Sequence, residues 1–178
     1  MSGGQHIDDS DRDRDRPWRP MSAGDLAAVH ELSMRVHPNY PERAEVLAEK
    51  FRLFPQGCFV LEADEGIAGY CFSHPWSKGV VPALDSLLGA LPVTPTTYYV
   101  HDLTLDAALR GQGQGRAIVP LLFQAALSLG LTHLSLVAVN RRGPFWQAAG
   151  FTRTADESLQ AMARAKYDSD AMHMERTL

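Results

Sequence analysis

The sequence predicts an α/β or α+β domain in which helices cover both faces of one sheet. Helical patterns come first, a hairpin signal follows, and strand and helix patterns then alternate up to the C-terminus. A glycine-rich segment, residues 110–120 with the sequence RGQGQGRAIVP, joins a strand pattern to a helix pattern. Because 178 residues suit one domain with a substantial core, we expect residues 17–178 to form a single domain.

The composition is that of an ordinary globular protein and excludes several functional classes. A net charge of −4 does not indicate a basic surface for nucleic acid. The sequence contains no run of about 18 apolar residues, so no membrane span is expected. The two cysteines, Cys58 and Cys71, are too few for a disulfide framework or a zinc site, and we expect no metal. Residues 1–16 are almost entirely polar, so we expect a disordered extension without a secretory signal. The default interpretation is a cytoplasmic enzyme or binding protein.

The N-terminal third of the domain predicts one short strand and two helices. The strand is expected near residues 17–20. Residues 22–36 carry apolar side chains at helical spacing, and Ser22 can cap the start of that helix. Pro41 can start a second helix over residues 42–54, because proline is tolerated in the first turn.

A hairpin and a long connection follow. The apolar runs at residues 58–63 and 67–73 flank a short polar turn, which is the signal of a β-hairpin. Residues 73–97 contain four prolines and a short helical pattern near residues 83–91. Connections of this length are often functional, so this one is a candidate wall for a substrate site.

The remaining elements surround the glycine-rich segment. A helix after it should run to about residue 129, where Gly130 is a typical residue just beyond a helix end. Pro120 should bend that helix near residue 116, since proline cannot donate the helical hydrogen bond. Further strands are expected at residues 98–105, 134–140, from 150 onward and, as an edge strand, at 171–176, with a short helix at 144–149.

The glycine-rich segment predicts an anion site. A glycine turn that opens a helix directs several main-chain N–H groups outward, where the helix dipole favours phosphate, and Arg110 and Arg116 add positive charge. The alternative is a plain tight turn. A Walker A loop fails because Arg116 follows Gly115. A dinucleotide fingerprint fails because its last glycine is missing, whether the count starts at Gly111 or at Gly113.

A third pattern fits this segment. Residues 110–115 read RGQGQG and match R-x-x-G-x-G, the pyrophosphate-loop motif of the GNAT N-acetyltransferase superfamily. The strand HDLTLDAAL before the loop, the strand LSLVAVN, Asn140 followed by PFWQAAGF, and the closing AMHMERTL resemble that family in the same order. The resemblance is strong over residues 98–154 and weak before residue 59. It implies a mixed, mostly antiparallel sheet that is splayed between its fourth and fifth strands.

The resemblance also implies acetyl-CoA as cofactor and a small-molecule amine as acceptor. Backbone N–H groups would hold the pyrophosphate, the fourth strand would pair with the pantetheine arm, one residue would bond the cofactor near its acetyl end, and one more could stack on the cofactor. In that order, these residues are Arg110, Gly111, Gln112, Gly113, Gln114, Gly115 and Arg116; Leu103, Thr104 and Leu105; and Asn140 and Trp146.

The catalytic groups are expected on the fourth strand. His101 titrates near neutral pH and is a candidate base, and Asp102 is its competitor. The alternative for His101 is a packed, hydrogen-bonded side chain. Strand alternation places Tyr99, His101, Leu103 and Leu105 on one face. Trp146 stands where many GNAT enzymes have a tyrosine, and an indole cannot act as an acid. The acid is therefore left open between solvent and the tyrosines Tyr98, Tyr99 and Tyr167.

The acceptor side is expected around His74, Trp76 and Tyr98. Trp76 in the long connection is either a lid or an anchor for the loop. Only Asp85 is acidic in that connection, so a strongly cationic acceptor is not indicated. Two other functions stay open: a CoA-binding sensor with weak or lost catalysis, and a protein or peptide N-acetyltransferase. A homodimer is compatible with the sequence.

Overall fold

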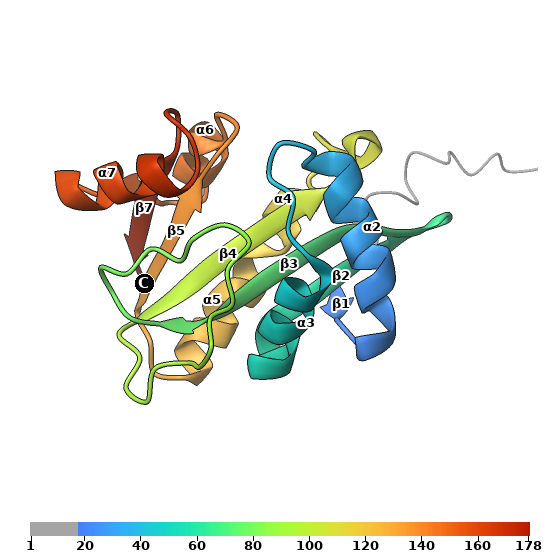
Figure 1. Cartoon of the computed structure of the whole chain (residues 1–178), viewed down its shortest axis with the longest axis horizontal. Coiled ribbons are helices and arrows are strands. Elements are labelled where there is room, and N and C mark those ends of the chain that lie inside the picture. The colour runs from blue at the N-terminus through green and yellow to red at the C-terminus, as the bar shows by residue number, and fades with distance from the viewer. Residues whose placement is uncertain (1–17) are drawn as a thin grey trace, which may run out of the picture.

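The computed structural model describes residues 18–178, which fold around one seven-stranded sheet (Figure 1). The strand order is β1-β2-β3-β4-β5-β7-β6. Every neighbouring pair is antiparallel except β4 and β5, which confirms the prediction of a mixed, mostly antiparallel sheet. The predicted disordered extension at residues 1–16 lies outside the described residues. The strands are β1 (Arg19–Pro20), β2 (Cys58–Ala63), β3 (Gly66–Trp76), β4 (Thr97–Leu105), β5 (His133–Ala138), β6 (Thr152–Arg153) and β7 (Met172–Thr177).

Two helices cover one face of strands β2 and β3 (Figure 1). They are α2 (Leu26–Val36), which follows a 3-10 turn at Ala23–Asp25, and α3 (Ala44–Leu53). Ser22 stands at the start of this unit as expected, and its main-chain N–H donates to the Asp25 carboxylate at 2.7 Å. Their apolar stripes pack on the sheet in one cluster, whose buried members are Met21, Val29, Leu32, Leu47, Cys58, Val60, Tyr70 and Phe72.

The opposite face carries the helices that follow the glycine loop, α4 (Gln114–Ala117) and α5 (Val119–Ser128). Figure 1 shows α5 behind the sheet, with α2 and α3 in front of it. The main core lies here, and its buried members include Tyr98, Val100, Ile118, Leu122, Ala126, Leu134 and Leu136. The prediction of helices on both faces is therefore confirmed.

Pro120 divides the helix that the sequence predicted as one bent element. The chain leaves α4 at Ile118 and resumes as α5 at Val119. Proline has no N–H with which to reach the carbonyl of Arg116, and that carbonyl accepts from Ile118 instead. The interruption therefore follows from a missing donor. Gly130 has φ +71°, as expected of the residue that ends a helix.

Two expectations about secondary structure were wrong. No helix forms near residues 83–91, because the main-chain N–H groups of Leu88 and Gly89 donate to the Glu49 carboxylate. The strand predicted at the sheet edge, β7, lies between β5 and β6. The short β6 takes the edge position instead.

A third difference is a helix that the sequence reading missed. Helix α7 (Glu157–Lys166) is capped by Asp156, which accepts from the main-chain N–H of Ser158 at 2.8 Å. The signal was present, because an aspartate precedes a glutamate and apolar residues recur four apart at Leu159 and Ala163. The helices of residues 18–178 include none that is long and apolar enough to cross a bilayer. The remaining short helix is α6 (Gly143–Ala148).

The tight approach of residue 57 to strand β3 gives a test of the fold. A Cβ on Gly57 would lie 2.0 Å from the carbonyl oxygen of Ser73, a backbone atom that cannot move aside cheaply. We expect Gly57→Ala to lower the free energy of unfolding by at least about 2 kcal/mol in urea denaturation. Gly24→Ala is the matched control, since its nearest contact is 3.7 Å away. Equal stabilities for the two variants would contradict this packing.

Candidate active site

A β-bulge at residue 101 decides which side chains of strand β4 reach the site. The pairing with β3 runs from Cys71–Leu103 and Phe72–Asp102 directly to Ser73–Val100, so His101 has no partner. One extra residue in a strand shifts the alternation of side chains beyond it. The site must therefore be read from the register of β4 and not from simple alternation.

The expected alternation along β4 was wrong for this reason. Leu103 and Leu105 pack with Val100 against the core under α5. His101 and Asp102 both face the side of the sheet that carries α2 and α3, where they contact Glu42 and His37. The bulge thus brings the two predicted candidate bases to the same side of the sheet.

Strands β4 and β5 separate just after they meet. They pair only at Tyr98–Leu134, Tyr99–Ser135 and Val100–Leu136. Beyond this point the strands enclose a cavity of about 420 Å³, a size typical of ligand sites. Of the predicted site residues it is lined by His101, Asp102, Leu103, Thr104, Leu105, Arg110, Gly115, Asn140 and Trp146.

The glycine loop stands at one end of this cavity. Gly111 and Gly113 have φ of +81° and +87°, a conformation that favours glycine, and an added Cβ would meet nothing within 4 Å. Gly115 instead lies against the Phe145 ring, which would be 3.1 Å from a Cβ. Among residues 18–178, the N–H groups of Gly111, Gln112 and Gly113 donate to no other backbone group. These three amides are therefore free of backbone partners in an exposed loop, which is a condition for an anion site.

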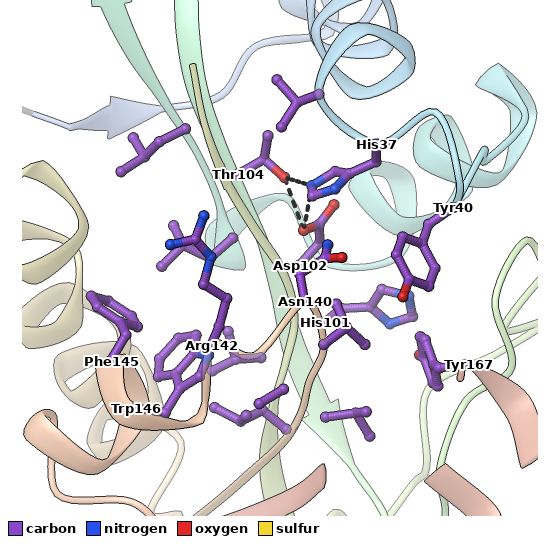
Figure 2. A pocket seen from close by; sticks show the side chains of 18 of the residues that line it. His37, Tyr40, His101, Asp102, Thr104, Asn140, Arg142, Phe145, Trp146 and Tyr167 are labelled. Atoms are coloured by element: carbon purple, nitrogen blue, oxygen red, sulfur yellow. Dashed lines mark hydrogen bonds and ion pairs between the residues drawn. The ribbon is translucent and has the colours of Figure 1, made fainter. Parts of the chain in front are cut away.

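The rest of the loop is anchored or exposed. The main-chain carbonyl of Gln114 accepts from the Trp18 indole at 2.9 Å, which ties the start of α4 to the N-terminal segment. Arg110 lines the cavity and Arg116 lies on the exposed side of α4. Arg142, which the sequence reading did not single out, lines the cavity from the end of β5 (Figure 2).

The backbone after β5 turns sharply beside the cavity. Asn140 and Arg141 have φ of +52° and +57°, in the left-handed region that few non-glycine residues adopt. The turn leads into α6, whose Trp146 is only 6% exposed and packs against Phe145 and Phe151. Asn140 and Trp146 therefore reach the same cavity wall from a short and locally strained segment.

A buried ion pair lies behind His101. The Lys50 ammonium on α3 is 2.6 Å from Glu42 Oε1, and the two side chains are 1% and 6% exposed. Glu42 Oε1 is also 3.8 Å from His101 Nε2. Burial alone would raise the pKa of Glu42, but His101 and Lys50 outweigh it and lower that pKa to about 2. Burial and the Lys50 charge lower the pKa of His101, so its imidazole is neutral at neutral pH.

Asp102 belongs to a second polar cluster beside the cavity (Figure 2). Its carboxylate accepts from the hydroxyl of Tyr70 at 2.6 Å and from that of Thr104 at 3.0 Å. His37 Nε2 lies 2.6 Å from the Thr104 hydroxyl oxygen and 4.0 Å from Asp102. Both carboxylate oxygens of Asp102 are therefore occupied by neighbours from β3 and β4.

The residues predicted for the acceptor side lie behind the cavity. His74 and Tyr98 are buried in β3 and β4, and Tyr98 shares a hydrogen bond of 2.8 Å with Ser73. The sequence placed Trp76 in the long connection, which was wrong, because it is the last residue of β3. Its indole donates to the Val80 carbonyl at 3.1 Å. Tyr99 is also buried and does not line the cavity.

Several lining residues were missed by the sequence reading. They are His37, Tyr40, Glu42 and Leu84, which come from α2, from the α2–α3 connection and from the β3–β4 connection. Tyr167, which the sequence reading considered as an acid, lines the same side. No local motif marks these residues, because the chain brings them to β4 only through tertiary packing. The described residues include no cluster of three histidine, cysteine or acidic side chains suited to a metal.

Comparison with known proteins places the chain in a family. Residues 26–151 match the model described as the acetyltransferase (GNAT) family. Because this match spans more than half of the chain, the protein belongs to the GNAT acetyltransferase family. No curated protein sequence matches the chain.

Solved structures share the fold at low sequence identity. The loading GNATL domain of CurA from Lyngbya majuscula has a TM-score of 0.71 at 14% identity, covering 90% of this chain and 96% of that one. The GphF GNAT-like decarboxylase in complex with isobutyryl-CoA gives 0.67 at 18%, covering 90% and 98%. Rv2747 from Mycobacterium tuberculosis in complex with CoA and NLQ gives 0.62 at 18%, also covering 90% and 98%. The two complexes show CoA compounds bound to proteins of this fold.

The buried ion pair gives a test of the site's construction. Lys50→Met leaves the Glu42 carboxylate buried without its cation, so we expect a loss of about 3 kcal/mol in the free energy of unfolding. The double variant Glu42→Gln/Lys50→Met removes both charges. Its loss of unfolding free energy should be clearly smaller than the sum of the losses in Glu42→Gln and in Lys50→Met. Urea denaturation of all four proteins measures this coupling. Strictly additive losses would show that the two charges do not interact.

Proposed function

We propose that the protein transfers an acetyl group from acetyl-CoA to the primary amine of a small molecule, with both substrates bound at once. The observation that carries this proposal is the cavity between β4 and β5. Its lining includes Arg110 and Gly115 of the glycine loop, which flank the amides of Gly111, Gln112 and Gly113, and the neutral imidazole of His101. A candidate anion site and a proton acceptor beside one cavity suit an acyl donor that carries a diphosphate.

The glycine loop is proposed to hold the diphosphate of CoA. The N–H groups of Gly111, Gln112 and Gly113, which donate to no other backbone group, would donate to its oxygens. The N–H groups of Arg110 and Arg116 already donate to the carbonyls of Ala107 and Gly113. Open space around Gly111 and Gly113 leaves room for a phosphate to approach the backbone. Arg110 and Arg142, at the cavity wall, add positive charge that favours an anionic ligand.

The exposed edge of β4 is proposed to bind the pantetheine arm. Beyond Val100 this strand has β3 on one side only, because β5 has turned away. The backbone of Leu103, Thr104 and Leu105 is thus available to pair with an extended ligand, as an edge strand does. Asn140 and Trp146 would contact the cofactor from the opposite wall.

The chemistry requires a base, an oxyanion partner and a proton donor. Bound acetyl-CoA supplies an activated thioester, whose carbonyl carbon accepts the amine nitrogen while the carbon–sulfur bond breaks. His101, neutral and at the cavity wall, is proposed to take the amine proton. Main-chain N–H groups of β4 would stabilise the negative oxygen that develops. Asp102 is the less favoured base, because Tyr70 and Thr104 already occupy its oxygens.

Tyr167 is the proposed proton donor to the departing thiolate, toward which its hydroxyl would have to turn from the Pro82 carbonyl that it donates to at 3.2 Å. It is the only one of the three tyrosines considered from the sequence that lines the cavity in the described part of the chain. Burial, with the nearby Glu42 charge, raises the pKa of its hydroxyl, so the proton is retained at neutral pH. Trp146 can contribute packing and one hydrogen bond but no proton.

The walls of the cavity favour a small acceptor over a peptide. Leu84 of the β3–β4 connection lines the acceptor side. The side chains of Lys166 and Tyr167 donate to the carbonyls of Val81 and Pro82, and Tyr40 donates to Asp168. These contacts tie three segments together beside the cavity, and we take this closure as support for a small acceptor. A protein N-acetyltransferase therefore ranks second, and a CoA sensor, which the replacement of tyrosine by Trp146 favours, ranks third.

The release of free CoA thiol tests this ranking. Purified protein is incubated with acetyl-CoA and, separately, with panels of small amines, with peptides bearing free N-termini, or without acceptor. Thiol release stimulated by small amines alone supports the proposal. Stimulation by peptides alone would support the second function, and CoA binding without turnover on any panel would support the sensor.

The cofactor assignment predicts the effect of one loop substitution. Gly113→Asp puts a negative side chain on the proposed anion site and strains a backbone with φ +87°, so we expect no detectable heat of CoA binding in calorimetry. Gly79→Asp is the matched control, because Gly79 has φ +82° and equally open surroundings but lies in the β3–β4 connection, outside the glycine loop. Unchanged CoA affinity in Gly113→Asp would refute the loop assignment.

The assignment of the base predicts a separation of binding from turnover. His101→Ala removes the proton acceptor but none of the groups proposed to hold CoA, so CoA affinity should stay the same. Turnover should fall by about 10²-fold or more, the usual contribution of a general base. Steady-state kinetics with calorimetry on the same preparation measure both quantities. Full activity in His101→Ala would remove this residue from the mechanism.

A further inference from the structure

Two buried histidines form a chain behind the proposed base. His74 Nδ1 lies 3.1 Å from the carbonyl oxygen of Pro75, and His74 Nε2 lies 3.5 Å from His101 Nδ1. The two rings are 5.6 Å apart between centroids. A carbonyl oxygen can only accept a hydrogen bond, so the proton on His74 must sit on Nδ1.

The protonation of His74 fixes the direction of the next hydrogen bond. His74 is 2% exposed, and burial lowers its pKa to about 3, with the nearby His101 as a further cause. The ring is therefore neutral at neutral pH, and its Nε2 carries a lone pair. A hydrogen bond between the rings then requires that His101 donate from Nδ1. Neutral His101 would in consequence carry its free lone pair on Nε2.

The surroundings of His101 Nε2 suit a proton acceptor. Glu42 Oε1 lies 3.8 Å away, and Glu42 and His101 both line the cavity. Figure 2 shows the His101 ring projecting toward the side on which Tyr40 and Tyr167 lie. The titratable and charged groups around the ring are Glu42 and Lys50 near α3, His74 on β3, Tyr99 and Asp102 on β4, and Tyr167 after α7.

We propose that the Pro75 carbonyl and His74 preset the tautomer of His101, so that the Nε2 lone pair faces the acceptor amine beside the Glu42 carboxylate. His74 is thus a positioning residue that acts through His101. Glu42 is the counter-ion of the imidazolium that forms when Nε2 takes the amine proton. The inference rests on the proposed acetyl transfer for its catalytic meaning, but the tautomer itself is a property of the protein alone.

The opposite tautomer would exchange the hydrogen bond to His74 for one to Glu42. If Nε2 carried the proton of neutral His101, Nδ1 would direct a lone pair at the lone pair of His74 Nε2, across 3.5 Å. The hydrogen bond between the two rings would be lost. His74 Nε2 and His101 Nδ1 would then both be buried without a hydrogen-bond donor, which is costly where water is excluded. Donation from Nε2 to Glu42 would be gained in exchange, so the balance depends on His74 as the acceptor.

Proton and electron accounting is complete in this scheme. The amine nitrogen forms a bond to the acetyl carbon, the carbon–sulfur bond breaks with its electron pair going to sulfur, and Nε2 takes one proton from nitrogen. The thiolate takes one proton from solvent, or from Tyr167, which then regains a proton from solvent. The imidazolium then returns its proton to solvent, and no oxidant or additional reactant is needed.

Nitrogen-15 NMR of histidine-labelled full-length protein without CoA tests the tautomer directly. In the wild-type protein at neutral pH we expect His101 to be protonated on Nδ1 and unprotonated on Nε2. His74→Phe keeps the aromatic volume but removes the acceptor, so His101 should shift toward protonation on Nε2. His74→Gln restores an acceptor on a side chain of similar reach and should restore the wild-type tautomer.

Turnover should follow the tautomer in the same three proteins. His74→Phe should lower kcat at least about tenfold with KM for acetyl-CoA unchanged, since a wrong tautomer disables a histidine base. His74→Gln should recover most of that loss. Protonation of His101 on Nε2 in the wild type, or no change in His74→Phe, would overturn the inference. If the wild-type protein showed no acetyl transfer, the proposed function would be refuted, and the NMR result on the tautomer would still stand.

Discussion

The site depends on one constraint, which is that strand β4 must leave its parallel partner β5 after three residue pairs. The bulge at His101 accompanies that departure, because the unpaired residue bends and twists the strand where pairing stops. One strand edge is left free and the chain after it enters the glycine loop. The cavity, the exposed backbone of β4 and the placement of the two candidate bases all follow from this local break in the sheet.

The interior beside the bulge is unusually polar for a small domain. A buried ion pair between Glu42 and Lys50 contributes little net stability by itself, because desolvation offsets most of the attraction. Its value here is that it keeps a carboxylate ionised at the cavity wall, next to a neutral imidazole. The neighbouring cluster of His37, Asp102 and Thr104 is satisfied within itself. The two clusters therefore differ in their contacts: the first places the Glu42 carboxylate 3.8 Å from His101 Nε2, and the second joins β4 to β3 and to His37 at the end of α2.

Sequence patterns predicted the parts of the fold that rest on local signals. The hairpin, the glycine loop, Gly130 and the effect of Pro120 each depend on the conformational preference of a few adjacent residues. Helix α7 was not predicted although its capping residue Asp156 is a local signal of the same kind. The other failures have a physical cause, because Glu49 captures the amides that a helix near residues 83–91 would have used, and no local pattern records a partner so distant in the chain.

What the sequence by itself determined is the family resemblance and the glycine loop, since glycine spacing and backbone freedom depend on neighbouring residues. Only the tertiary structure decided which side chains meet at the cavity. The bulge moved His101 and Asp102 to the same side of the sheet, and packing of α3 brought Glu42 and Lys50 behind them. Side-chain direction after a bulge, and the charge state of a buried group, depend on register and on contacts between distant segments, which a linear pattern does not contain.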